Sequence, residues 1–339
     1  MLSVCIITKN EQNYLEECLK RCSRYPVEVV VVDTGSTDHS KEIAANYTDQ
    51  IYDFVWCDDF SAARNFAASK AHNDVIIAVD SDEWIEKLDP EQIERIMQEF
   101  PQSIGRLTCI SEYTLKGKKL KSVDHLKRIY DRRFCRFEGK VHEQIVNISG
   151  CESKTFPAEM IVDHRGYDID SEQKQKKTER NLKLLKAELT EHPKDTYLLY
   201  QIGKSYYFIE DYVNAVDFFC QALDTDWDPR NEYCLDLLTC LGYALVNCGL
   251  KEAALELEKY WEYYPNNADY TYMMGYIYMQ NARFEQAIDT FLQATNYAEG
   301  TVQGTNSYLA YYNAAVILDC MGRKEEAEEL YQKSRDLSS

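Results

Sequence analysis

Three apolar runs in the first 80 residues each end in a cluster of polar residues. The runs Leu2–Ile7, Glu28–Val32 and Asp74–Val79 are rich in β-branched side chains, and helical patterns separate them. A continuous apolar run is typical of a strand buried on both faces, and strands that alternate with helices favour a parallel sheet covered by helices. The first part of the chain is therefore predicted to be an α/β domain with a mostly parallel sheet.

A second pattern fills the chain after residue 195. Gly203 and Gly275 are each followed by matching aromatic, apolar or small residues at offsets of 3, 12, 16 and 19, and weaker copies start at Gly242 and Ala315. Successive copies lie 39, 33 and 40 residues apart. Small residues at a close helix crossing, followed by aromatics one turn later, predict an all-α array of helix–turn–helix units. The array resembles the tetratricopeptide repeat.

The segment between these patterns changes character twice. Residues 104–164 are β-rich and irregular, and a polar helix ended by Pro193 follows from Ser171. We therefore expect an α/β domain over 1–170, a connecting helix over 171–194 and repeats over 195–339. The predicted strands of the β-rich region lie near Arg106–Ile110, Leu126–Tyr130, Val141–Ile148 and Met160–Val162.

Composition excludes two classes of function. The chain has 57 acidic and 38 basic residues, a net charge of −19, which argues against nucleic acid as the main partner. No window approaches the apolar length of a transmembrane segment. We accordingly expect a cytoplasmic protein whose twelve cysteines are thiols.

The polar clusters at the strand ends are the candidate site, because ligands bind beyond the carboxyl ends of parallel strands. The clusters Thr8–Glu11, Asp33–Asp38 and Asp80–Glu83 should share one edge of the sheet. The alternate carboxylates of Asp80 and Asp82 can converge on Mg²⁺ or Mn²⁺ bridging a diphosphate. A solvated acidic turn is the alternative for an isolated pair of this kind.

Two further residues fit a nucleotide at that edge. The carboxylate of Asp33 could bond a ribose or a base edge, and Gly35 allows a tight turn before the next helix. Arg64, on a helix predicted over 62–71, could offset phosphate charge or stack on a base. The alternatives are a helix cap for Asp38 and a surface position for Arg64.

The motifs TKNE (8–11), DTGSTD (33–38), FSAARN (60–65) and AVDSDE (78–83) together resemble a family 2 glycosyltransferase of the Rossmann-like GT-A fold. The likeness covers roughly residues 1–170. It implies an inverting transferase that uses a nucleotide-sugar, usually a UDP-sugar, and a divalent metal. The residues it assigns to the nucleotide-sugar are Thr8, Asn10, Glu11, Asp33, Arg64, Asp80 and Ser81.

The same resemblance implies an acceptor loop that contains a glycine, then an acidic base, and later a metal-binding histidine. Residues 139–144 and 163–167 fit these places, and the usual acidic pair is replaced by Glu143-Gln144. The resemblance therefore makes Glu143 the base, with Gly139 in the acceptor loop, and assigns the metal to Asp82 and His164. His142 could orient the acceptor, although a hydrogen-bonded strand histidine is the alternative.

A basic stretch lies between the metal motif and the proposed base. Residues 116–140 hold ten basic and three acidic side chains, or +7. Arg132, Arg133 and Arg136 could offset phosphate charge there or hold an acidic acceptor, and a solvated face is the alternative.

The leading hypothesis is transfer of a sugar to a Ser, Thr or Cys side chain of a peptide or protein held by the repeats. In this combination of motifs the chain is similar to bacterial peptide S-glycosyltransferases of the glycocin type. Two alternatives are a cell-surface glycan or lipid-linked acceptor, and a scaffold built on a catalytically weak transferase domain. The intact Asp80, Asp82 and Glu143 argue against the scaffold. The repeats could also mediate homo-oligomerisation.

Overall fold

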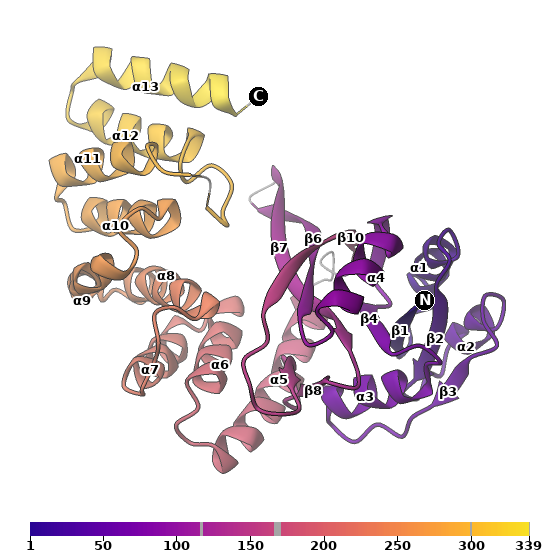
Figure 1. Cartoon of the computed structure of the whole chain (residues 1–339). Coiled ribbons are helices and arrows are strands. Elements are labelled where there is room, and N and C mark those ends of the chain that lie inside the picture. The colour runs from indigo at the N-terminus through magenta and orange to yellow at the C-terminus, as the bar shows by residue number, and fades with distance from the viewer. Residues whose placement is uncertain (116–117, 166–170, 299, 339) are drawn as a thin grey trace. The chain divides into compact units, whose positions relative to one another are not determined.

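The computed structural model describes residues 1–115, 118–165, 171–298 and 300–338 (Figure 1). The chain divides into two compact units, Met1–Gln173 and Lys174–Ser339. The first unit is an α/β sheet domain and the second is a helical array, so the predicted fold class is confirmed. None of the described helices is both long and apolar enough to cross a lipid bilayer.

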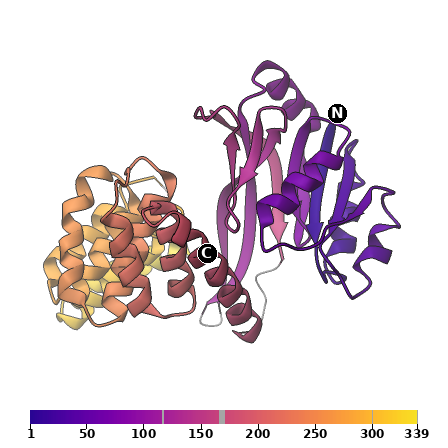
Figure 2. The same cartoon turned by 90° about the horizontal axis from the view of Figure 1, so that it is seen from below.

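The first unit is built on one twisted sheet, whose strands lie side by side in Figure 2. Its strands are β1 (Leu2–Thr8), β2 (Glu28–Asp33), β3 (Ile51–Asp53), β4 (Val75–Asp80), β5 (Glu83–Leu88), β6 (Ile104–Leu115), β7 (Lys118–Asp131) and β10 (Thr155–His164). Their order is β3-β2-β1-β4-β7-β6-β10-β5. The first four of these are parallel, whereas β7 runs antiparallel to both β4 and β6, so the sheet is mixed beyond β4.

Helices cover both faces of this sheet because the strands are apolar on both sides. Helices α1 (Leu15–Cys22) and α4 (Pro90–Glu99) pack on one face, and α3 (Phe60–Lys70) packs on the other. The short α2 (Ser40–Ala44) follows β2. Asp59 and Asp89 cap α3 and α4 by accepting from backbone N–H groups three residues ahead, which fixes where each helix begins.

Two strand predictions need correction. Only Gln144–Asn147 of the strand predicted over 141–148 is extended, as β9, and it pairs with β8 (Cys135–Glu138). Gly139 and His142 have φ values of +96° and +54°, a left-handed backbone that a strand cannot continue through. Strand β5 was not predicted, because it starts at the last residue of the DSDE motif and carries charged residues at adjacent positions.

The second unit is a stack of helix pairs that follows α5 (Ser171–Glu191). The pairs are α6 (Thr196–Phe208) with α7 (Tyr212–Leu223), α8 (Glu232–Asn247) with α9 (Lys251–Ala254) and the 3-10 helix η1 (Leu255–Tyr263), α10 (Ala268–Gln280) with α11 (Phe284–Ala294), and α12 (Tyr308–Cys320) with α13 (Lys324–Leu337). These are the predicted repeats.

The repeat glycines lie where neighbouring side chains come closest. A Cβ atom on Gly203 would lie 2.6 Å from the Phe219 ring, and one on Gly275 would lie 2.9 Å from the Phe291 ring. Both contacts stay within one helix pair. At Gly242 the contact crosses to the next pair, because a Cβ there would lie 2.3 Å from the sulfur of Met273. Only glycine fits these positions without displacing its neighbour.

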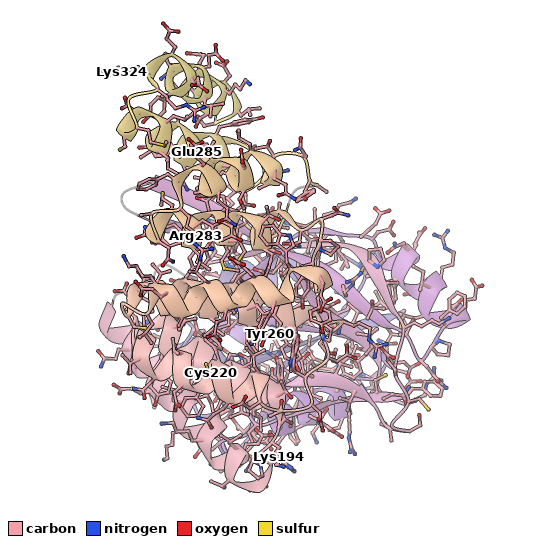
Figure 3. The ribbon with its side chains drawn as sticks, turned by 90° about the vertical axis from the view of Figure 1, so that its left-hand side faces the viewer. Lys194, Cys220, Tyr260, Arg283, Glu285 and Lys324 are labelled. Atoms are coloured by element: carbon pink, nitrogen blue, oxygen red, sulfur yellow. The ribbon has the colours of Figure 1, made fainter. Side chains whose placement is uncertain are left out.

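Ion pairs also link successive repeats. Arg283, just before α11, pairs with Glu258 of the preceding repeat at 3.2 Å, and Arg323, just before α13, pairs with Glu285 at 3.1 Å. Figure 3 labels Arg283 and Glu285, which are one member of each of these two pairs. These pairs are partly exposed, so they contribute to the register between repeats more than to stability.

Glu28, at the amino end of β2, is the centre of a hydrogen-bond cluster that joins three segments of the first unit. Its carboxylate accepts from the Ser3 hydroxyl, from Gln50 at 2.5 Å and from the His72 backbone N–H at 2.9 Å. Burial alone would raise the pKa of Glu28, but these hydrogen bonds outweigh it and lower the pKa from 4.5 to about 2.

This cluster predicts an acid-sensitive contribution to stability. A carboxylate whose pKa is lowered by folding stabilises the fold above its ordinary pKa, so the contribution should be lost as pH falls from about 4.5 towards 2. Glu28→Gln is expected to lower the free energy of unfolding by about 1–3 kcal/mol at neutral pH. In denaturant titrations, the difference in free energy of unfolding between Glu28→Gln and the wild type should become smaller towards pH 2. Glu16→Gln, at an exposed carboxylate, is the control, and a gap that does not change with pH would contradict the assignment.

Candidate active site

The sheet register brings the three polar clusters to one edge. Thr8 at the end of β1 is paired with Asp33 at the end of β2, and Ile7 is paired with Asp80 at the end of β4. Adjacent parallel strands are separated by roughly 4.8 Å. The side chains that follow these strands can therefore contact a single ligand.

The loops after β1 and β2 are held together through Asn10. The side-chain oxygen of Asn10 accepts from the Thr37 backbone N–H at 2.8 Å, and the backbone N–H of Asn10 donates to the Ser36 hydroxyl at 2.9 Å. The Glu11 N–H similarly donates to Ser40 at 2.8 Å. Asn10 was predicted to contact the nucleotide-sugar, but its side-chain oxygen is already used to shape the loop after β2.

Three buried polar atoms near this edge have no hydrogen-bond partner among the described residues. They are the Thr8 hydroxyl, Oδ2 of Asp33 and Nη1 of Arg64. The other Asp33 oxygen accepts from the backbone N–H groups of Gly35 and Ser36, at 2.9 Å each, so the carboxylate is fixed in place. Buried polar groups without partners are rare in native proteins, and a polar ligand is one explanation for them.

Arg64 of α3 joins two carboxylates that are far apart in the sequence. Its Nη2 donates to Asp80 at 2.7 Å, and its Nε donates to Glu143 at 2.5 Å. The side chains of Arg64 and Glu143 are only 6% and 9% exposed. A buried arginine needs such partners, because an unpaired charge is costly to remove from water. The predicted base and the first aspartate of the DSD motif therefore share one guanidinium.

Two further residues belong to this cluster: Arg128, which the sequence places only in the basic stretch, and Glu83, which it places in the polar cluster without a role. Arg128 of β7 donates to the second oxygen of Asp80 at 2.9 Å and lies 3.6 Å from Glu83. Burial would raise the pKa of Asp80, but Arg64 and Arg128 hold it well below its usual range. Burial and the nearby Asp80 raise the pKa of Glu83 to about 7. Glu83 was detectable as the residue that ends the DSDE motif, whereas Arg128 reaches the site through the β4–β7 pairing, which no motif encodes.

Asp82 and His164 meet at the end of β10. The register pairs His164 with Glu83, which brings the His164 Nε2 to 3.2 Å from the Asp82 carboxylate. Burial lowers the pKa of His164, but the hydrogen bond and charge of Asp82 outweigh it, and the net shift is upward. Both side chains are partly exposed, so they can face a ligand.

The residues present fit a divalent cation whose coordination is completed by oxygen atoms of a substrate. Among the described residues there is no group of three His, Cys, Asp or Glu side chains arranged to hold a metal. Mg²⁺ commonly takes one or two protein ligands together with phosphate oxygens and water. Asp82 and His164 can supply that share, whereas both oxygens of Asp80 are already bonded to arginines.

The other predicted site residues lie in different surroundings. Ser81 is buried in the turn after β4, and Gly139 and His142 form the left-handed positions of the loop before β9. Arg136 pairs with the exposed Glu138 on β8. Lys116, Gly166 and Tyr167, which belong to motifs of the sequence analysis, lie outside the described residues.

The position predicted for Arg132 has to be revised. Its guanidinium donates to the carbonyl oxygens of Ala68 and Ala71, at 2.6 and 2.7 Å, and lies 3.3 Å from Asp74. Asp74 precedes β4, so Arg132 lies at the opposite end of that strand from Asp80. A cation is favourable there because it satisfies the carbonyl groups at the end of α3.

Comparison with known proteins matches two parts of the chain to two known families. Residues 3–151 match the model of glycosyl transferase family 2, and residues 268–301 and 308–338 match the tetratricopeptide repeat. A TPR repeat-containing protein of Synechococcus elongatus is 30% identical over 216 residues, which are 60% of this chain and 51% of that protein. The SPbeta prophage-derived glycosyltransferase SunS of Bacillus subtilis is 26% identical over 224 residues, which are 65% of this chain and 52% of SunS.

The chain thus spans about half the length of these two relatives. Among solved structures, MamA from Desulfovibrio magneticus matches 48% of the chain with 85% of its own length, at 20% identity and a TM-score of 0.41. The order of the motifs, the sheet and the family match agree over the same residues. Residues 3–151 form a family 2 glycosyltransferase domain, which this chain joins to tetratricopeptide repeats.

Proposed function

We propose that the protein is an inverting, metal-dependent glycosyltransferase that moves a sugar from a UDP-sugar to a peptide or protein held by the repeats. The observation that carries the proposal is the joining of Asp80 and Glu143 through Arg64, next to the Asp82–His164 pair. These residues lie at the ligand-binding edge of the sheet, and all but His164 fall within the family 2 match.

The donor would lie over the ends of β1, β2 and β4. Thr8 and Asp33 each offer a buried oxygen without a partner among the described residues, and these atoms suit the hydroxyl and amide groups of a nucleoside. Asp82 and His164 would hold Mg²⁺ or Mn²⁺, which when bound offsets the charge of a leaving diphosphate. An acceptor attacking from the opposite face of the sugar must lose a proton, and Glu143 would take it.

The proposed acceptor is a Ser, Thr or Cys side chain of a peptide or protein. Helical repeats present extended surfaces on which a polypeptide can lie. The likeness to the glycosyltransferase SunS over 224 residues supports sugar transfer, and the choice of a polypeptide acceptor rests on the repeats. Transfer to a glycan or lipid-linked acceptor is the outcome to be separated from it.

A panel of UDP- and GDP-sugars tests the donor directly. Hydrolysis of each sugar nucleotide is measured with Mg²⁺, with Mn²⁺ and with chelator, beside thermal shift. We expect one UDP-sugar to raise the melting temperature and to be hydrolysed slowly in the presence of metal. Stabilisation without turnover would support the scaffold hypothesis, and preference for a GDP-sugar would overturn the proposed donor.

A shortened chain that ends near residue 170 tests the role of the repeats. We expect it to bind the UDP-sugar with unchanged affinity, because the candidate donor site lies within the first unit. Transfer to a peptide acceptor that the full chain modifies should be lost, because the proposed docking surface is gone. Calorimetry and mass spectrometry of the acceptor measure the two quantities. Transfer at the full rate would show that the repeats do not recognise the acceptor.

A further inference from the structure

Helix α3 contacts the loop that carries Glu143, and the strand that leads into it, at three places. Near its start, the Phe60 backbone N–H donates to the Lys140 carbonyl at 2.8 Å. One turn later Arg64 donates to the Glu143 carboxylate. The next residue, Asn65, donates to the Phe137 carbonyl at 2.9 Å and accepts from the Phe137 N–H at 3.0 Å. The FSAARN motif thus contacts Phe137, Lys140 and Glu143, at the start, middle and end of this segment.

This loop needs such support because strand pairing does not reach it. The last pair of the β8–β9 hairpin is Glu138 with Gln144, so residues 139–143 are the connection between the two strands. Gly139 and His142 both have a left-handed backbone. A non-glycine residue held in an unfavourable backbone conformation persists only where its surroundings fix it.

Asn65 is chemically matched to its part in this contact. Its amide group donates to and accepts from the backbone of the same residue, Phe137, just as a neighbouring strand would. Aspartate at this position keeps the acceptor but loses the donor, and alanine loses both. The contact with Phe137 fixes the strand that leads into the loop, while Arg64 fixes the carboxylate at the end of the loop.

We propose that Arg64 and Asn65 are positioning residues, which together hold the loop 139–143 so that Glu143 is in place before the acceptor arrives. The FSAARN helix then serves the acceptor side of the reaction through the loop, in addition to any contact with the donor. The proposal rests on the proposed function, in which Glu143 is the base. A displacement of about 1 Å in a reacting group can lower a rate by about 100-fold, so a residue that fixes the base can matter as much as one that touches substrate.

The test compares full-length Asn65→Asp, Asn65→Ala and Arg64→Lys with the wild type. Ser69→Ala is the control on the same helix, because the exposed Ser69 donates to the carbonyl of Phe66 within α3. Two quantities are measured: kcat and KM for hydrolysis of the preferred UDP-sugar, and hydrogen exchange of the amides of residues 137–143. Melting temperatures identify any variant that does not fold.

We expect each Asn65 variant to lower kcat by about 10- to 100-fold, with KM within about twofold of wild type and faster exchange in the loop. Asn65→Asp, which keeps the acceptor, should be the milder of the two. Arg64→Lys should also lower kcat, because an ammonium group cannot bridge two carboxylates as a guanidinium does. Unchanged kcat, equal changes in kcat and KM, or unchanged exchange in a folded variant would overturn the positioning role. A wild type that hydrolyses no sugar nucleotide would instead overturn the proposed function, and hydrogen exchange would still decide whether α3 fixes the loop.

Discussion

Replacement of Glu143 by glutamine is expected to lower turnover by about 10²- to 10⁴-fold, the usual contribution of a general base. Glutamine has nearly the same size, and its amide oxygen can still accept from Arg64, so the loop should keep its conformation. The KM for the UDP-sugar should stay within about twofold, because the lost interaction belongs to the transition state. Steady-state kinetics with the preferred donor measures both constants.

The neighbouring Glu138→Gln is a suitable control, because that exposed carboxylate pairs with Arg136 outside the cluster. A Glu143→Gln enzyme with near-normal turnover would transfer the role of base to Asp124 of β7, Asp163 of β10 or His142. A fall in turnover of less than about 10²-fold would instead indicate the kind of acceptor atom. If the acceptor is a thiol, part of it is already ionised at neutral pH, and the need for a base is reduced.

Asp82→Ala is expected to abolish metal-dependent binding of the UDP-sugar while the protein remains folded. Asp82 and His164 are the two partly exposed groups that fit a cation, and removal of the carboxylate leaves a single neutral ligand. Without the cation, the diphosphate would face the carboxylates of this edge with less compensating charge. Isothermal titration with the donor, in Mn²⁺ and in chelator, measures the loss.

Asp53→Asn provides the matched control, since Asp53 is an exposed carboxylate at the end of β3 that pairs with Lys41. Its affinity for the donor should equal that of the wild type under both conditions. Full turnover of the wild type in excess chelator would contradict the metal requirement. Loss of folding in Asp82→Ala would be detected by its melting temperature, and Asp82→Asn would then replace it.

The sequence was sufficient for those parts of the fold that depend on local pattern. The apolar runs at Leu2, Glu28 and Asp74 predicted three adjacent strands of the sheet, and the spacing of small residues from Gly203 to Ala315 predicted the helix pairs. In both cases the pattern of buried side chains can be recognised within a short stretch of sequence. The polar clusters could be placed together because parallel strands align their carboxyl ends.

The remaining parts depend on pairings between distant segments. Strand β7 runs antiparallel to β4, so Arg128 lies beside Asp80 at one end of β4 and Arg132 lies beside Asp74 at the other end. The two arginines are only four positions apart in the sequence. The left-handed backbone at His142 likewise lies in the connection between β8 and β9, whereas the residue pattern alone favours a strand there. A basic stretch in the sequence therefore did not distinguish a cluster at the site from a helix cap at the opposite end of the strand.

The glycine contacts of the repeat array determine how far the effect of a larger side chain would spread. At Gly203 and Gly275 the nearest ring belongs to the same helix pair, so an added methyl group would displace Phe219 or Phe291 within that pair. At Gly242 the nearest atom is the sulfur of Met273, which lies on the pair that follows. A larger residue at position 242 would therefore disturb the packing between two pairs, whereas one at position 203 or 275 would disturb a single pair.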